Sequence, residues 1–168
     1  TSTPSVLGSE QVYYTNRSFP SSTNVEIFPI NYYDTYLDLP SGLTAPTSVY
    51  QESVTTQTQG LTTVSKVRVL DPSAVAGQAD WITTVTYFDR KARPIYVYTH
   101  NEFLETTDIV ERKLDFKGKV LETKTTHQKV GVADNLVTID RFEYDHMDRL
   151  INQSQKVNDL VTERIVRN

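Results

Sequence analysis

The sequence predicts an all-β fold: antiparallel β-hairpins joined into an extended, twisted sheet. Thr and Val are the two commonest residues and make up about a quarter of the chain. Both are β-branched, so they lose rotamer freedom in a helix and fit the pleated surface of a sheet. Ten Tyr and six Phe accompany a single Met. No window keeps a 3.6-residue apolar period over three turns, so no helix is expected.

Charge divides the chain of 168 residues into two regions. Residues 1–60 carry five acids and one base, which leaves 16 acids and 16 bases in residues 61–168, so the net charge of −4 lies in the first third. The first region is rich in Ser and Thr and is interrupted by five prolines, which remove donors from a sheet ladder. We therefore expect a Ser/Thr/Pro-rich β segment at 1–60 and a hairpin sheet at 61–168.

The expected strands follow from alternating β-rich runs between turn residues. In the first region they are short, at 11–15, 25–30 and 31–37. In the second region they are expected at 62–70, 81–88, 95–99, 109–114, 120–126, 137–144 and 150–156, and the last residues, 165–168, also have strand character. Residues 71–79 contain Pro, Ser, Ala and Gly and are expected to form one long loop before Trp81.

Three turns of the second region share one pattern and indicate an internal repeat. Residues 88–94, 114–120 and 144–150 align without gaps as an apolar residue, Asp, two variable residues, a turn residue, a base and a further residue. An Asp at this place accepts hydrogen bonds from the backbone of the turn, and Gly three places later takes the left-handed conformation that closes a hairpin with a bulge. Since Ala92 replaces that Gly, the first hairpin is expected to have a different turn type. The turn residues are Asp89, Asp115, Asp145, Gly118, Arg93, Lys119 and Arg149, with Phe88, Leu114 and Tyr144 packing the hairpins.

The third turn, YDHMDRL at 144–150, resembles the YD repeat of the Rhs/YD-repeat family, in which Tyr precedes Asp-x-x-Gly-Arg-Leu. The flanking runs are similar to Bacteroidetes-type Rhs proteins: WITTVTY at 81–87, RPI at 93–95, DFKGKV at 115–120 and TTH at 125–127. Asn31-Tyr32-Tyr33-Asp34 resembles the segment upstream of the repeats. The chain departs from the pattern at Ala92 and Asp148, where the family has Gly, and at Lys119, where it has Arg.

This resemblance implies a large, secreted or cell-surface bacterial protein whose YD hairpins form a spiralling sheet. In toxin-bearing members the sheet is a shell around a C-terminal toxin. We therefore expect a fragment of a longer protein with a non-enzymatic, structural role as part of a β-shell wall. Its partners would be neighbouring repeats of the same polypeptide, and exposed sheet edges predict self-association.

An alternative function is recognition of a glycan or a protein by a cell-surface adhesion module. Trp81, Tyr87, Tyr96 and Tyr98 flank the first turn and would form its ligand platform on one face of the sheet. Aromatic residues that alternate along strands are more often cross-strand pairs and core, so we favour packing for these rings.

Motifs for catalysis and for cofactors are missing. The chain has no Cys, no G-x-S-x-G and no glycine-rich phosphate loop, so no enzyme activity and no cofactor are expected. A glycosidase-type pair of carboxylates has no local motif, and that class stays open. His100, His127 and His146 lack the spacing of a metal site.

Composition also bears on ions, nucleic acids and membranes. Two acidic pairs are candidate calcium ligands, although turn capping is the favoured role. The acidic net charge disfavours nucleic acid, and no apolar run is long enough for a membrane span. The acidic pairs are Asp145 with Asp148 and Asp34 with Asp38.

Overall fold

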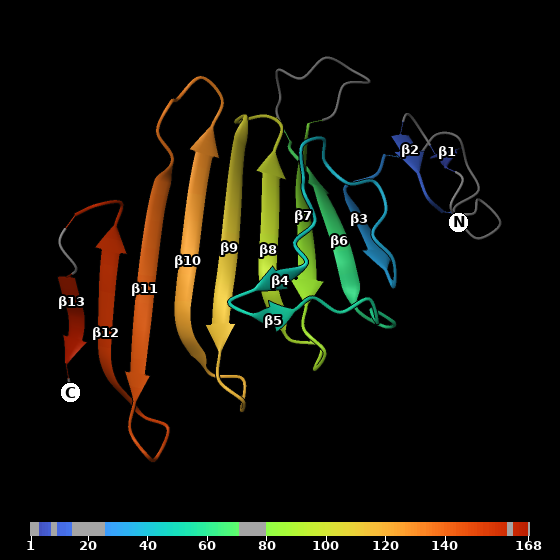
Figure 1. Ribbon diagram of the computed structural model, residues 1–168. Coiled ribbons are helices and arrows are strands. Elements are labelled where there is room, and N and C mark those ends of the chain that lie inside the picture. Colours follow the sequence, from blue (N-terminus) through green and yellow to red (C-terminus); the bar gives the residue numbers. More distant parts are fainter. Residues whose placement is uncertain (1–3, 8–9, 15–25, 71–79, 161–162, 168) are drawn as a thin grey trace.

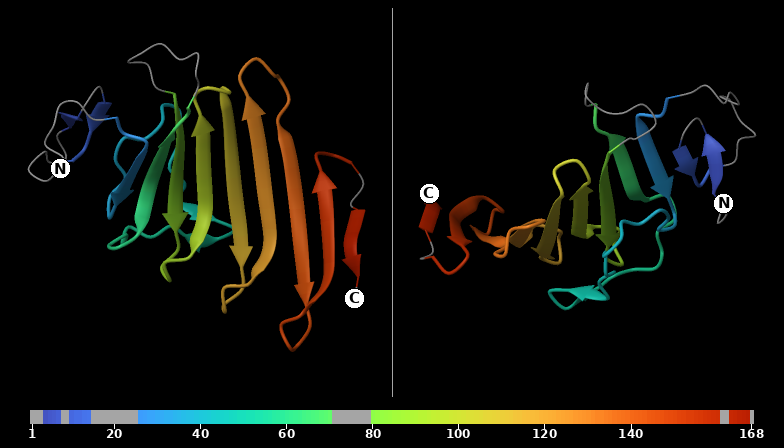
Figure 2. Two further views of the ribbon diagram at one scale, coloured as in Figure 1. Left: turned by 180° about the vertical axis from the view of Figure 1, so that it is seen from behind. Right: turned by 90° about the horizontal axis from the view of Figure 1, so that it is seen from above.

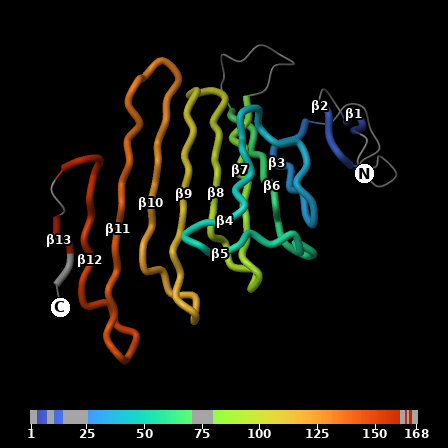
Figure 3. Tube along the Cα trace, viewed as in Figure 1, coloured from blue at the N-terminus to red at the C-terminus, as the bar shows by residue number. Residues whose placement is uncertain are grey.

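The computed structural model describes residues 4–7, 10–14, 26–70, 80–160 and 163–167, and these residues form strands and turns without a helix (Figure 1). The main sheet contains nine strands in the order β13-β12-β11-β10-β9-β8-β7-β6-β3. Eight of them, β6 to β13, follow one another in the chain as an antiparallel meander, which confirms the all-β prediction (Figure 3). Their bounds are β6 Thr62–Arg68, β7 Trp81–Phe88, β8 Pro94–Asn101, β9 Thr106–Leu114, β10 Val120–Lys129, β11 Leu136–Tyr144, β12 Leu150–Val157 and β13 Glu163–Arg167.

The first region contributes one strand to the same sheet. β3 (Pro29–Tyr33) pairs antiparallel with β6 and spans parts of two expected strands, 25–30 and 31–37. It ends before Asp34, which has a φ of 67° and turns the chain away from the sheet. Two small hairpins lie outside the sheet, formed by β1 (Ser5–Leu7) with β2 (Glu10–Val12) and by β4 (Ser48–Val49) with β5 (Glu52–Ser53). The loop expected at 71–79 and Thr15 of the first expected strand lie outside the described residues.

The hydrophobic core joins both regions of the sequence. Its buried side chains come from β2, β3, β6, β7 and β8: Val12, Ile30, Tyr32, Val64, Trp81, Val85, Tyr87 and Tyr98. Alternate residues of a strand point to the same face, so Trp81, Val85 and Tyr87 of β7 lie on one face of the sheet. The acidic first region is therefore packed into the same core as the start of the hairpin region.

A long connection between β3 and β6, residues 34–61, crosses this face of the sheet, and we call it the strap (Figures 1 and 2). The ring of Tyr36 stacks on that of Tyr87 at 4.5 Å between centroids. The Tyr36 hydroxyl donates a hydrogen bond to the Thr86 carbonyl at 3.1 Å. Further along, the Tyr50 hydroxyl donates to Glu122 Oε1 at 2.8 Å, so the strap reaches from β7 to β10.

The sheet is a single layer in its second half, as the view from above shows (Figure 2). Beyond Thr106 none of the described side chains is buried. Polar cross-strand contacts replace a core there, such as Lys124 Nζ to Glu111 Oε2 at 2.8 Å and Gln155 Nε2 to Asp140 Oδ1 at 2.9 Å. This half is held by its backbone ladder and by these pairs, which contribute less than burial of apolar surface.

We expect backbone protection to decrease along the meander. The strands β6 to β8 carry core side chains, so local opening of their backbone exposes buried apolar surface. Local opening of β11 to β13 exposes no core and therefore costs less free energy. Hydrogen exchange followed by mass spectrometry should therefore show the slowest exchange in β6 to β8 and at least roughly tenfold faster exchange in β11 to β13. Uniform protection across all strands would contradict this account.

Candidate functional site

The three Asp turns connect β7 to β8, β9 to β10 and β11 to β12. They lie side by side at one end of the strands, at the bottom of Figure 1, and we call this the turn end of the sheet. In each turn the backbone N–H of Asp donates to the carbonyl of the base four residues later, at 2.9 Å for Asp89, 2.8 Å for Asp115 and 2.9 Å for Asp145. In each, the N–H of the residue three places later donates back to the Asp carbonyl, at 3.0 to 3.1 Å. The three turns thus have the same backbone hydrogen bonds.

The Asp side chain completes each turn. Asp89 Oδ1 accepts from the backbone N–H groups of Lys91 at 2.8 Å and Arg93 at 2.9 Å. Its Oδ2 accepts from Arg93 Nε at 2.6 Å. Asp145 accepts from the N–H groups two and four residues later, both at 2.9 Å, and from Nε of Arg149 at 2.7 Å. One carboxylate therefore satisfies the turn backbone and fixes the base beside it.

The residue three places after Asp has a positive φ in all three turns: 59° at Ala92, 100° at Gly118 and 63° at Asp148. The expectation that Ala92 changes the turn type is therefore wrong. A non-glycine residue costs about 1 to 2 kcal/mol in this conformation. The charge-assisted hydrogen bonds of Asp89 supply more than that.

A bulge follows each turn; the sequence predicted a bulge at the left-handed residue, and the register shift lies just beyond that residue. Tyr87 pairs with Tyr96 and Phe88 pairs with Pro94, which leaves Ile95 as the extra residue. The same shift leaves Leu121 and Ile151 unpaired in the second and third hairpins. All three extra residues are aliphatic and lie six places after Asp.

Basic side chains tie each turn to the next one. Arg93 Nη1 donates to the Asp115 carbonyl at 2.8 Å. Lys119 Nζ donates to Asp148 Oδ1 at 2.5 Å and Lys117 Nζ to Oδ2 of the same carboxylate at 3.2 Å. These two ammonium groups hold the pKa of Asp148 below its ordinary value. The turn end of the sheet is thus a connected row of turns.

The capping carboxylates also have lowered pKa values. Burial alone raises the pKa of Asp89, but hydrogen bonds from Arg93 and Lys91 outweigh it and lower the pKa below its usual range. The backbone N–H and the guanidinium of Arg149 lower the pKa of Asp145. Both carboxylates are therefore held in their charged form by the turns that they close.

The four aromatic residues considered as a ligand platform do not form an exposed surface. Trp81, Tyr87 and Tyr98 are only 4%, 3% and 7% exposed, because the strap and the β2–β3 end of the molecule cover their face. Tyr96 is partly buried and its ring meets that of Tyr87 edge to face at 5.8 Å. These rings pack against one another and against the strap.

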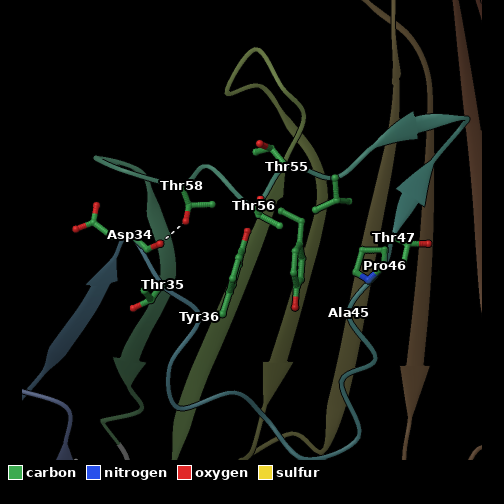
Figure 4. Close-up of a pocket in the computed structure, with 11 residues that line it drawn as sticks. Asp34, Thr35, Tyr36, Ala45, Pro46, Thr47, Thr55, Thr56 and Thr58 are labelled. Atoms are coloured by element: carbon green, nitrogen blue, oxygen red, sulfur yellow. Dashed lines mark hydrogen bonds between the residues drawn. The ribbon is translucent and has the colours of Figure 1, made fainter. Parts of the chain in front are cut away.

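A pocket of about 600 Å³ lies between the strap and the sheet (Figure 4). Asp34 and Thr58 stand on one side of it and Ala45, Pro46 and Thr47 on the other. The complete lining is Asp34, Thr35, Tyr36, Ala45, Pro46, Thr47, Val54, Thr55, Thr56, Thr58 and Tyr87. The sequence did not predict that Tyr36 meets Tyr87 here, since their contact spans 51 residues and has no local signature.

Within the described part of the chain, no group of three or more His, Asp or Glu side chains is placed to hold a metal ion. The acidic pairs proposed for calcium have protein partners: Asp34 Oδ1 accepts from the Gly60 N–H at 2.6 Å and Asp38 pairs with Lys66 at 2.7 Å. Within the same residues, no helix has the length and apolar character needed to span a membrane.

Comparisons with protein-family models, with curated proteins and with solved structures found no match to this chain.

The first turn should be the most sensitive to loss of its Asp. Asp89→Ala removes a carboxylate that is 2% exposed and leaves two N–H groups and Arg93 without their acceptor, so we expect a loss of about 3 kcal/mol in the free energy of unfolding. Asp145→Ala is the matched control, since the same turn there has an exposed Arg149. Urea denaturation should show a smaller loss for the control. Equal losses would contradict a role for burial.

Acid should destabilise the protein through these turns. The lowered pKa values of Asp89, Asp115, Asp145 and Asp148 mean that the unfolded chain binds more protons than the folded chain in the acid range. The stability that these carboxylates contribute is present above the ordinary Asp pKa of about 3.9 and is lost as pH falls through the lower folded values. Urea midpoints measured between neutral pH and about pH 3 should fall only at the acid end. Asp145→Asn should flatten that fall, and an unchanged profile would contradict the assignment.

Proposed function

We propose that this chain is a structural segment of a secreted or cell-surface bacterial Rhs/YD-repeat protein and forms part of a β-shell wall. In toxin-bearing proteins of this kind, the wall encloses a C-terminal toxin. The observation that carries the proposal is the row of three turns with the same hydrogen bonds, each joined to the next by a basic side chain.

The row of turns supports a wall because it joins neighbouring hairpins at their turns. Arg93 is fixed by its own Asp89 and donates to the following turn, so it links one hairpin to the next in addition to the backbone ladder between β8 and β9. The contact depends on side chains within one repeat and on a backbone carbonyl of the next. Such nearest-neighbour contacts extend a sheet one hairpin at a time.

The single-layer half of the sheet supports the same function. Side chains on both of its faces are partly exposed, and contacts such as Arg141 Nε to Glu122 Oε2 at 2.7 Å run along the face from strand to strand. A sheet that is solvated on both faces would suit a wall between two aqueous spaces, since it needs no second layer. A non-enzymatic, wall-forming role needs no more than this.

The coding sequence on both sides of residues 1–168 tests the proposal. We expect further Asp turns with a base four residues after Asp, at intervals of roughly 26 to 30 residues, followed in a toxin-bearing protein by an unrelated C-terminal domain. Adjoining sequence with helical periodicity and no such turns would contradict the proposal.

Exposed strand edges should make the isolated chain self-associate. β13 pairs only with β12 among the described strands, so its outer edge is open, and Ile165 on it is 51% exposed. Sedimentation velocity should show a mass that rises with protein concentration. Ile165→Lys places a charge on the edge and should shift the protein towards monomer. Val130→Lys, in an exposed loop, is the control and should not; a monomer at all concentrations would contradict the expectation.

A further inference from the structure

We propose that the main sheet has one closed edge, β3, and one open edge, β13, so that two copies of this chain join through their β13 strands and stop at a two-fold dimer. In the described part of the chain the sheet ends at these two strands. An edge strand recruits another strand through its outward backbone N–H and carbonyl groups. The proposal therefore depends on the groups that each edge offers, and it is independent of the wall function, which the adjoining coding sequence tests.

Hydrogen bonds at both ends of β3 identify the residues that face outward. The Arg68 N–H donates to the Phe28 carbonyl at 2.8 Å, and the Asp34 N–H donates to the Leu61 carbonyl at 3.1 Å, so even-numbered residues face β6. Backbone groups alternate in direction along an antiparallel strand. The odd-numbered residues of β3 are therefore directed away from the sheet, and they are Pro29, Asn31 and Tyr33.

None of these three residues has both an N–H and a carbonyl for a new strand. Pro29 has no N–H. The Asn31 carbonyl accepts a hydrogen bond from the Tyr14 hydroxyl, and the Tyr33 carbonyl accepts one from the Thr35 N–H at 2.7 Å. A hydrogen-bonded antiparallel pair needs the N–H and the carbonyl of the same residue. β3 is thus a poor template for a further antiparallel strand.

The β1–β2 end of the molecule holds Tyr14 at this edge. The Tyr14 ring stacks on that of Tyr32 at 5.5 Å between centroids, and the Tyr13 N–H donates to the Tyr32 hydroxyl at 3.3 Å. Val12, in the strand just before these tyrosines, belongs to the same buried core as Tyr32. The hydroxyl that closes the edge is therefore anchored through the hydrophobic core.

The β13 edge is open among the described strands. β13 pairs there with β12 alone, and its Ile165 is 51% exposed. A second copy presents this same edge and no other, since its β3 is closed. Two β13 strands that meet edge to edge run antiparallel about a two-fold axis and use up both open edges. Association then ends at two copies, whereas contact of β13 with β3 would add copies without limit.

Cross-linking of single cysteines tests which edge joins the copies, since the chain has no Cys of its own. Ile165→Cys on β13 and Tyr33→Cys on β3 replace exposed side chains at the two edges. Ile165 is the extra residue of a bulge opposite β12, so a short bismaleimide is preferred to a disulfide, whose geometry is strict. We expect at least roughly tenfold more covalent dimer with Ile165→Cys than with Tyr33→Cys. Equal yields, or a larger yield with Tyr33→Cys, would overturn the proposal.

Sedimentation velocity tests where association stops. The unaltered chain should approach twice the monomer mass as its concentration rises and go no further. Pro29→Thr combined with Tyr14→Phe restores an N–H and frees the Asn31 carbonyl, so masses above the dimer are expected. Pro46→Thr, on the strap, is the control and should stop at the dimer. The proposal is overturned by masses above the dimer in the unaltered chain, by a monomer at all concentrations, or by a double variant that still stops at the dimer.

Discussion

The turn end of the sheet depends on the hydrogen bonds that the Asp carboxylate accepts at the start of each turn. One oxygen of Asp89 accepts backbone N–H groups inside the turn, and the other holds the guanidinium of Arg93. Nε and Nη2 of Arg93 bind Asp89, and this leaves Nη1 to donate to the Asp115 carbonyl of the next turn. The same side chain therefore closes a hairpin and prepares the contact with its neighbour.

The environment of this interaction changes along the row. The Asp89 side chain is 2% exposed, whereas those of Asp115 and Asp145 are each 17% exposed. The first turn is covered by the strap, whose Thr55 N–H bonds the Phe88 carbonyl. Hydrogen bonds gain strength when water is excluded, so identical local chemistry contributes more at the first turn than at the third.

The features predictable from the sequence are those whose causes lie within a few residues. The bounds of β7 match the expected strand, and the all-β meander follows from composition and alternation. The strap was not predictable, because the stacking of Tyr36 on Tyr87 and the bond from Tyr50 to Glu122 join residues far apart in the chain. The alternating pattern of β7 places Tyr87 on one face of the sheet, and the pattern is the same whether that face meets solvent, the core or another segment. Its neighbours, and hence its role, depend on a segment with no repeat to mark it.

The two halves of the molecule therefore suit different tasks for a physical reason. The repeating half makes the same local contacts in each hairpin, and such contacts produce a regular surface. The strap is a single, non-repeating segment that is held by its contacts with β7 and β10. The row of turns therefore maintains a regular sheet, whereas the strap covers part of one face with contacts that occur once in the molecule, such as the stacking of Tyr36 on Tyr87.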